Sequence, residues 1–137
     1  MEFKLFYKSY DYKASINAVK QFKQATGEDL WSTLLRYMVT FTNSRKAGDS
    51  IADTLSKLSE VVGFVESAQL FYCLAKQESK TLTLDEIEDA MFHAGILPSQ
   101  EEGDMCEPYP FVLYQIALDI ITYHSTLSTE KKPSAPF

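Results

Sequence analysis

The chain has 137 residues, of which 45% are hydrophobic and 13% aromatic, and its formal net charge is −6 at pH 7. This length and composition predict one domain with a single hydrophobic core, which we assign to residues 1–127. Only 13 Lys and Arg are available to neutralise phosphate, so nucleic acid and anionic membrane surfaces are excluded as expected partners. The apolar runs are far shorter than the roughly 20 residues that span a bilayer.

The N-terminal segment has the pattern of a small β-hairpin. Residues 2–7 alternate, with Phe3, Leu5 and Tyr7 on one face, which is the period of a half-buried strand. Residues 10–12 can return antiparallel to it. No Asn-Gly or Asp-Gly dipeptide marks the turn between them.

From Ser15 onward the hydrophobic period becomes helical. The first helix is predicted to end at Gly27, and the second to begin at Asp29. Residues 43–48 are predicted to form a loop, after which the third helix begins at Asp49 or Ser50. Gly63 either breaks the chain between two helices or permits a close helix contact. The sequence predicts a fold of the mainly α class, a compact bundle of about five helices with a small N-terminal hairpin. The predicted helices cover 15–27, 29–42, 49–62, 64–77, 83–94 and 109–127. The inward-facing residues predicted for the first three are Ile16, Val19, Phe22 and Ala25; Leu30, Leu34, Met38 and Phe41, flanked by Trp31 and Leu35; and Ile51, Leu55, Leu58 and Val62.

Residues 82–96 carry the most complete set of helix signals. Thr83 and Glu86 form a capping-box pattern, in which each side chain accepts a hydrogen bond from the other residue's amide. Leu82 and Ile87 occupy the positions of a hydrophobic staple. Gly95 suits a left-handed C-terminal cap. The helix that these signals predict follows the apolar helix 64–77 closely, so the two are expected to form an αα-hairpin.

Two further segments are predicted to lie outside the helices. Residues 97–108 form a polar, acidic connection, and a connection of this length inside a compact domain is often mobile or a contact site. Residues 128–137 contain two prolines and little that can be buried. We therefore expect a flexible C-terminal tail.

The residues with chemical potential form no recognisable catalytic or metal-binding motif. Asp85 and Glu86 resemble the entering helix of a calcium-binding hand, but the ligand loop is missing and acids are favoured at any helix start. His93 precedes a helix end, His124 lies on the apolar side of the last helix, and Cys73 falls within the buried helix. The sequence has no Gly-rich phosphate loop, nucleophile elbow or H-E-x-x-H motif. These features favour a binding protein without metal or cofactor over an enzyme.

Two segments carry a resemblance to a known family. Residues 24–31, Gln-Ala-Thr-Gly-Glu-Asp-Leu-Trp, place an Ala-Thr-Gly turn before a leucine-rich helix. Residues 74–91 run from the end of an apolar helix into a threonine-capped acidic one. In this order, after a short strand pair, they resemble the tail assembly chaperones of long-tailed bacteriophages and prophages, of the lambda-like siphovirus type. The likeness covers roughly residues 3–97 and consists of structural rather than catalytic motifs.

The resemblance implies a non-catalytic protein of the bacterial host cytoplasm. Such chaperones coat the tape measure protein, help to recruit tail tube subunits during tail morphogenesis, and are absent from the finished virion. The family often makes a second, longer product by ribosomal frameshifting near the end of the first reading frame. Lys131 and Lys132 lie near the end of this sequence, and adjacent lysine codons can form a slippery run. The resemblance thus implies four partners: the tape measure protein, the tail tube protein, further copies of the chain and a frameshifted product.

Aromatic residues near the N-terminus are the candidate partner-binding groups, namely Phe6, Tyr10 and Tyr12. Exposed apolar groups mark interaction sites, and Tyr suits a position that is dry at one end and wet at the other. The alternative is that these aromatic residues close the core over the hairpin.

Two other functions stay open at this point: a structural tail or head-completion component retained in the virion, and a small cytoplasmic regulator or enzyme.

Overall fold

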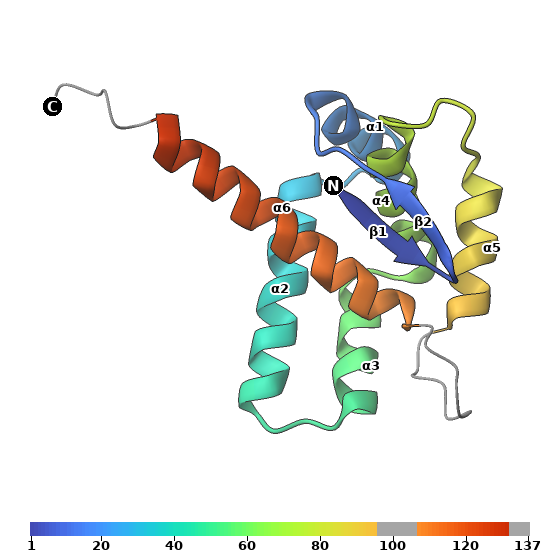
Figure 1. Cartoon of the computed structure of the whole chain (residues 1–137). Coiled ribbons are helices and arrows are strands. Elements are labelled where there is room, and N and C mark those ends of the chain that lie inside the picture. Colours follow the sequence, from blue (N-terminus) through green and yellow to red (C-terminus); the bar gives the residue numbers. More distant parts are fainter. Residues whose placement is uncertain (96–106, 132–137) are drawn as a thin grey trace, which may run out of the picture.

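The computed structural model describes residues 1–95 and 107–131, with side chains described as far as Tyr123. The chain is mainly helical and begins with a two-stranded antiparallel sheet, which confirms the predicted fold class (Figure 1). The described residues form six helices, one in each of the six predicted ranges, whereas the predicted fold class gave a bundle of about five. The elements are β1 (Glu2–Leu5), β2 (Lys8–Asp11), α1 (Ile16–Thr26), α2 (Leu30–Lys46), α3 (Ile51–Val61), α4 (Phe64–Lys76), α5 (Leu84–Ala94) and α6 (Tyr109–Lys131).

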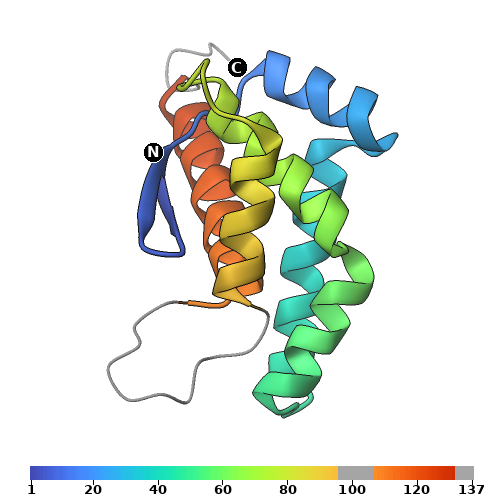
Figure 2. The ribbon, with the colours of Figure 1, turned by 90° about the vertical axis from the view of Figure 1, so that its right-hand side faces the viewer.

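Helix α4 lies at the centre of the core, as its apolar circumference predicts. It packs against α1 and α5, and the hairpin covers it through a contact between the rings of Phe3 and Phe71, whose centroids are 5.1 Å apart. Helices α2 and α3 form a pair that extends away from the hairpin, and α6 crosses α2 (Figures 1 and 2). The buried residues of α4 are Ser67, Ala68, Leu70, Phe71, Cys73, Leu74 and Ala75.

The chain bends sharply between α3 and α4. Gly63 caps the start of α4, and the two helices differ in direction by 75°. Of the two readings that the sequence left open for Gly63, the structure shows the helix break. No single helix in the described part of the chain is long and apolar enough to cross a membrane; α3 and α4 pass that test only when they are counted together across this bend.

The predicted helix starts are confirmed by their caps. The side chains of Ser15, Asp29, Ser50 and Thr83 accept hydrogen bonds from the amides of Ala18, Ser32, Asp53 and Glu86, respectively. At the other end of α1, Gly27 has a φ of 80° and donates to the carbonyl of Lys23. Gly95 also has a positive φ, 76°, but its ψ of 178° lies outside the left-handed helical region, so the predicted form of that cap is wrong.

Part of the predicted burial of α1 is wrong, for a geometric reason. Ile16 is 71% exposed and Ala25 is exposed, whereas Ala18 and Phe22 are buried. A helix turns by about 100° per residue, so a spacing of three drifts by about 60° at each step, and three steps carry Ala25 to the face opposite Ile16. The spacing of four between Ala18 and Phe22 keeps both side chains on the core side.

Other predicted inward-facing residues also lie on the surface. Leu35 and Ile51 are exposed, and Tyr7 lies in the hairpin turn rather than on the buried face of a strand. Tyr37, which the predicted stripe of α2 omitted, is buried instead of Leu35.

Two helix ends differ from the prediction. α2 continues to Lys46, because the buried hydroxyl of Ser44 bonds to Asp49 and Thr54 and so ties the helix end to α3. α6 continues to Lys131, so residues 128–131 are helical rather than part of a flexible tail. Most of the acidic connection 97–108, and residues 132–137, lie outside the described residues.

Candidate functional site

The hairpin turn is formed by two bulky aromatic residues in an unfavourable backbone conformation. Leu5 pairs with Lys8, so Phe6 and Tyr7 make a two-residue loop, and their φ angles are 45° and 66°. Positive φ at both positions is the pattern of a type I′ turn, which normally uses Asn-Gly because a Cβ is disfavoured there. Aromatic residues at these positions store of order 1 kcal/mol or more each.

The turn places these aromatic side chains against the C-terminal end of α5. The Phe6 ring stacks on the His93 ring at a centroid distance of 5.2 Å and contacts the Tyr7 ring at 5.1 Å. Phe92, which is 75% exposed, meets the His93 ring edge-on at 5.8 Å. We call Phe6, Tyr7, Phe92 and His93 the tip cluster. All four are exposed, so the cluster presents an aromatic surface to solvent.

A second contact fixes the hairpin along α5. The Lys8 ammonium donates to the Glu86 carboxylate at 2.6 Å and lies 5.2 Å from the centroid of the Tyr10 ring. The hydrogen bond from Lys8 holds the pKa of Glu86 below its usual value. The amide of Glu86 donates to Thr83, as the capping box predicts, whereas its carboxylate accepts from Lys8. The hairpin is therefore attached near both ends of α5.

Of the three residues predicted to bind a partner, one lies on the surface. Phe6 is 38% exposed, but Tyr10 and Tyr12 are 7% and 2% exposed and belong to the core. Burial, together with the charge of Glu86, raises the pKa of Tyr10 to about 12. Burial, together with the charge of Asp119, raises that of Tyr12 to about 12. The buried rings of Tyr10 and Tyr12 cannot present a surface to a partner in this conformation, so we keep the prediction for Phe6 alone.

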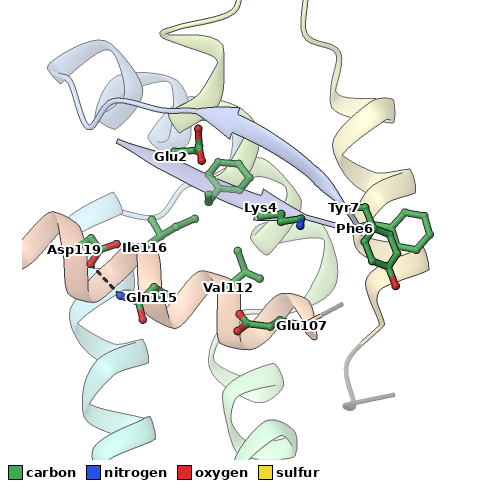
Figure 3. A pocket seen from close by; sticks show the side chains of 10 residues that line it. Glu2, Lys4, Phe6, Tyr7, Glu107, Val112, Gln115, Ile116 and Asp119 are labelled. Atoms are coloured by element: carbon green, nitrogen blue, oxygen red, sulfur yellow. Dashed lines mark hydrogen bonds between the residues drawn. The ribbon is translucent and has the colours of Figure 1, made fainter. Parts of the chain in front are cut away.

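A groove of about 270 Å³ lies between β1 and α6 (Figure 3). The apolar side chains that line the groove include Phe3, Val112 and Ile116. Its polar and charged side chains include Glu2, Lys4 and Asp119. Phe6 and Tyr7 line one end, so the groove is continuous with the tip cluster (Figure 3). The full lining is Glu2, Phe3, Lys4, Phe6, Tyr7, Glu107, Val112, Gln115, Ile116 and Asp119.

The other groups with chemical potential are dispersed. Cys73 is buried, and burial raises its thiol pKa to about 11, which keeps it protonated near neutral pH. His93 lies 3.4 Å from Asp89 on the same exposed face of α5. Within residues 1–95 and the described part of 107–131, no three His, Cys, Asp or Glu side chains gather in a way that could hold a metal ion. The side chains of Cys106 and His124 lie outside the described residues.

The sequence did contain a signal for Phe92 and His93, which we missed. Leu84, Ile87 and Met91 mark the core side of α5, and Phe92 follows Met91 by one residue, or about 100° of helix rotation. A large aromatic residue next to the buried stripe is a candidate surface anchor. Its contact with the hairpin turn depends on tertiary packing and could not be predicted from this pattern.

We compared the chain with protein-family models, curated proteins and solved structures, and none of the three comparisons yielded a significant match.

Proposed function

We propose that this chain is a non-catalytic tail assembly chaperone of a long-tailed bacteriophage or prophage, which binds the tape measure protein and tail tube subunits in the host cytoplasm. The resemblance of residues 24–31 and 74–91 to that family supports the proposal. The observation that carries a protein-binding role is the tip cluster, where Phe6 and Tyr7 are held exposed in a strained turn. Strain retained at a surface site is typical of residues kept for binding rather than for stability.

The tip cluster has the properties that a shield for an apolar, aggregation-prone client needs. Phe6 and Phe92 offer exposed rings, and Tyr7 and His93 add polar atoms that can remain hydrated. The attachment of the hairpin to α5 through Lys8 and Glu86 keeps the rings in place before a partner arrives. A pre-organised aromatic surface loses less conformational entropy on binding than a flexible one.

The test is co-expression of the tagged chain with the tape measure protein and the tail tube protein encoded in the same genome. We expect both to co-purify with the wild-type chain, and we expect the Phe6→Asn/Phe92→Asn variant to lose at least tenfold of the recovered tape measure protein. Asn suits the positive φ of residue 6, so this variant keeps the turn. The matched control is Leu35→Asn/Val39→Asn, which removes two exposed apolar side chains from α2 and should leave recovery unchanged.

Two further measurements separate this proposal from its alternatives. Mass spectrometry of purified virions should find this chain absent; abundant recovery would instead indicate a structural tail or head-completion component. The gene should lie between those of the tail tube and tape measure proteins, with a slippery sequence at the codons of Lys131 and Lys132 and an overlapping downstream frame. A gene without these neighbours would contradict the phage assignment.

A further inference from the structure

One edge of β1 carries backbone groups that β2 does not use. Leu5 pairs with Lys8 to close the hairpin, and the Met1 carbonyl accepts from the Tyr12 amide at 2.9 Å. Because bonded pairs alternate along an antiparallel ladder, Met1, Phe3 and Leu5 face β2, and the N–H and C=O groups of Glu2 and Lys4 face the opposite edge. Within the described residues, the backbone groups of Glu2 and Lys4 have no hydrogen-bond partner.

This free edge runs along the groove that α6 closes on its other side (Figure 3). Phe3, Val112 and Ile116 give the groove an apolar floor, and Gln115 and Asp119 stand on its helical wall. A strand edge beside a helix, with an apolar floor between them, is the arrangement by which protein modules take up an extended peptide as an additional strand.

The charges around the groove indicate what kind of peptide it suits. The groove is lined by three carboxylates, those of Glu2, Glu107 and Asp119, and by one ammonium group, that of Lys4. The Lys4 ammonium lies 6.0 Å from the centroid of the Tyr7 ring, at the end of the groove near the tip cluster. The charge in the groove therefore complements a basic ligand, and the net charge of −6 adds to this attraction at longer range.

We propose that the groove binds an extended peptide in which apolar and basic residues alternate, and that this peptide pairs with the free edge of β1. The apolar side chains lie over the floor of the groove, where Phe3, Val112 and Ile116 each expose 5% or less of their surface, and the main apolar contact is with the more exposed Phe6 ring at the end of the groove. The basic side chains face Glu2 and Asp119. β1 has four residues, so the paired segment is about four to five residues long. The proposed peptide ligand belongs to the groove beside the tip cluster, and the proposal does not depend on the phage assignment.

Fluorescence anisotropy with three labelled seven-residue peptides tests the pairing. The probe alternates Val and Lys, a second peptide alternates Val and Glu, and a third repeats the Val-Lys sequence with every amide N-methylated. Saturable binding of the probe, with at least tenfold weaker binding of the other two, supports the proposal. No saturable binding of the probe, or equal binding of the N-methylated peptide, which cannot pair as a strand, would overturn it.

Matched variants locate the binding to this edge. Glu2 and Asp11 are opposite each other in the register, but only Glu2 lines the groove, so Glu2→Lys and Asp11→Lys change the charge equally. We expect at least a fivefold loss of probe affinity for Glu2→Lys and less than a twofold loss for Asp11→Lys. Equal losses would mean that only the overall charge matters, and the site would then be rejected.

Proline provides a test of the backbone groups. The amides of Lys4 and Ser9 both point away from the hairpin ladder, at opposite edges, so Lys4→Pro and Ser9→Pro leave the ladder intact. Lys4→Pro should weaken the binding of the probe at least fivefold, and Ser9→Pro should leave it unchanged.

Sedimentation velocity of the wild-type chain without peptide tests whether a second copy of the chain occupies this edge instead. A dimer that Lys4→Pro dissociates would show that it does, and would overturn the peptide proposal.

Discussion

The chain reverses direction tightly at two places near the N-terminus, and both turns require a positive φ. One turn uses glycine there, and the other uses two aromatic residues. Between α1 and α2, Gly27 has a φ of 80°, and no atom lies within 4 Å of the position that a Cβ would occupy. Between β1 and β2, Phe6 and Tyr7 have φ angles of 45° and 66°. Glycine adopts a positive φ at no steric cost, whereas an aromatic residue adopts it only with steric strain. The first reversal is suited to stability, and the second retains strain that an Asn-Gly turn would relieve.

The contrast extends to the regions around the two reversals. In the helical body the starts of α1, α2, α3 and α5 each have a side-chain cap, and only α4 begins without one, at Gly63, among the helices whose caps are described. One buried hydroxyl of this body, that of Ser59 in α3, has no hydrogen-bond partner among the described residues. The hairpin region combines a strained turn with two groups that have no hydrogen-bond partner among the described residues: the strand edge at Glu2 and Lys4, and the buried Tyr12 hydroxyl. Natural sequences concentrate such local conflicts at functional sites. This distribution is why both proposals concern the hairpin.

The largest effect is expected from relieving the turn. Phe6→Asn/Tyr7→Gly supplies the residues that a type I′ turn favours and should raise the free energy of unfolding by about 2 kcal/mol. Relief of about 1.5 kcal/mol at each of the two positions totals about 3 kcal/mol. Loss of the stacking between Phe6 and His93 offsets about 1 kcal/mol of this relief, which leaves the stated net gain. Urea denaturation gives the measurement.

The matched control is Phe6→Ala/Tyr7→Ala, which removes both rings but keeps a Cβ at each strained position. It should be less stable than the wild type. If the Asn-Gly variant were also less stable, the rings would contribute more to packing than the turn costs, and the contrast between the two reversals would disappear.

The opposite change at the other reversal should have a smaller effect. Gly27→Ala places a Cβ in the left-handed region and should lower the free energy of unfolding by about 1 to 1.5 kcal/mol. Open space around this position excludes a clash as the cause. Gly27→Asn should recover part of the loss, because Asn tolerates this conformation. Equal melting temperatures for Gly27→Ala and the wild type would show that the corner relaxes without cost.

The cap of α5 gives a comparable but more local test of the helical body. The Thr83 hydroxyl accepts from the amide of Glu86 at 3.2 Å, so Thr83→Ala should cost about 1 kcal/mol, and Thr83→Ser should cost much less. An unchanged melting temperature for Thr83→Ala would mean that this hydrogen bond does not determine where α5 begins.

These differences also explain what the sequence could predict. Caps and helix ends depend on residues within one turn of helix, so Ser15, Gly27, Asp29 and Thr83 were assigned correctly from local patterns. Burial depends on neighbours far along the chain, so the surface position of Ile16 and the core position of Tyr37 were not predicted. Residues 6–7 lacked any turn signal because the turn contradicts the usual residue preferences.

The candidate site was predictable only in part for the same reason. Phe6 was selected from the density of aromatic residues alone, and the same criterion also selected Tyr10 and Tyr12, whose rings are buried. The groove requires β1 and α6, which lie more than a hundred residues apart and come together only through packing on the core.

The smallest effect at neutral pH is expected for Tyr12, and it distinguishes two buried tyrosines. The Tyr37 hydroxyl donates to the carbonyl of Pro110 at 3.0 Å, whereas the Tyr12 hydroxyl has no partner among the described residues. Tyr37→Phe leaves a buried carbonyl unpaired and should cost about 1 to 2 kcal/mol. Tyr12→Phe removes only an unpaired group, so at pH 7 it should change the free energy of unfolding by less than about 0.5 kcal/mol.

The same variant should become more stable than the wild type in alkali. The pKa of Tyr12 is raised from 10.0 to about 12 in the folded chain, so between these values the unfolded chain loses its proton first. Wild-type stability therefore falls as pH rises from 10 to 12, with no contribution from this group below pH 10. Tyr12→Phe lacks this loss, and the other tyrosines cancel in the difference between the two proteins. Urea denaturation at pH 7 and pH 11 measures it: a stability difference that stayed the same at both pH values would show that the Tyr12 hydroxyl ionises as readily in the folded chain as in the unfolded one.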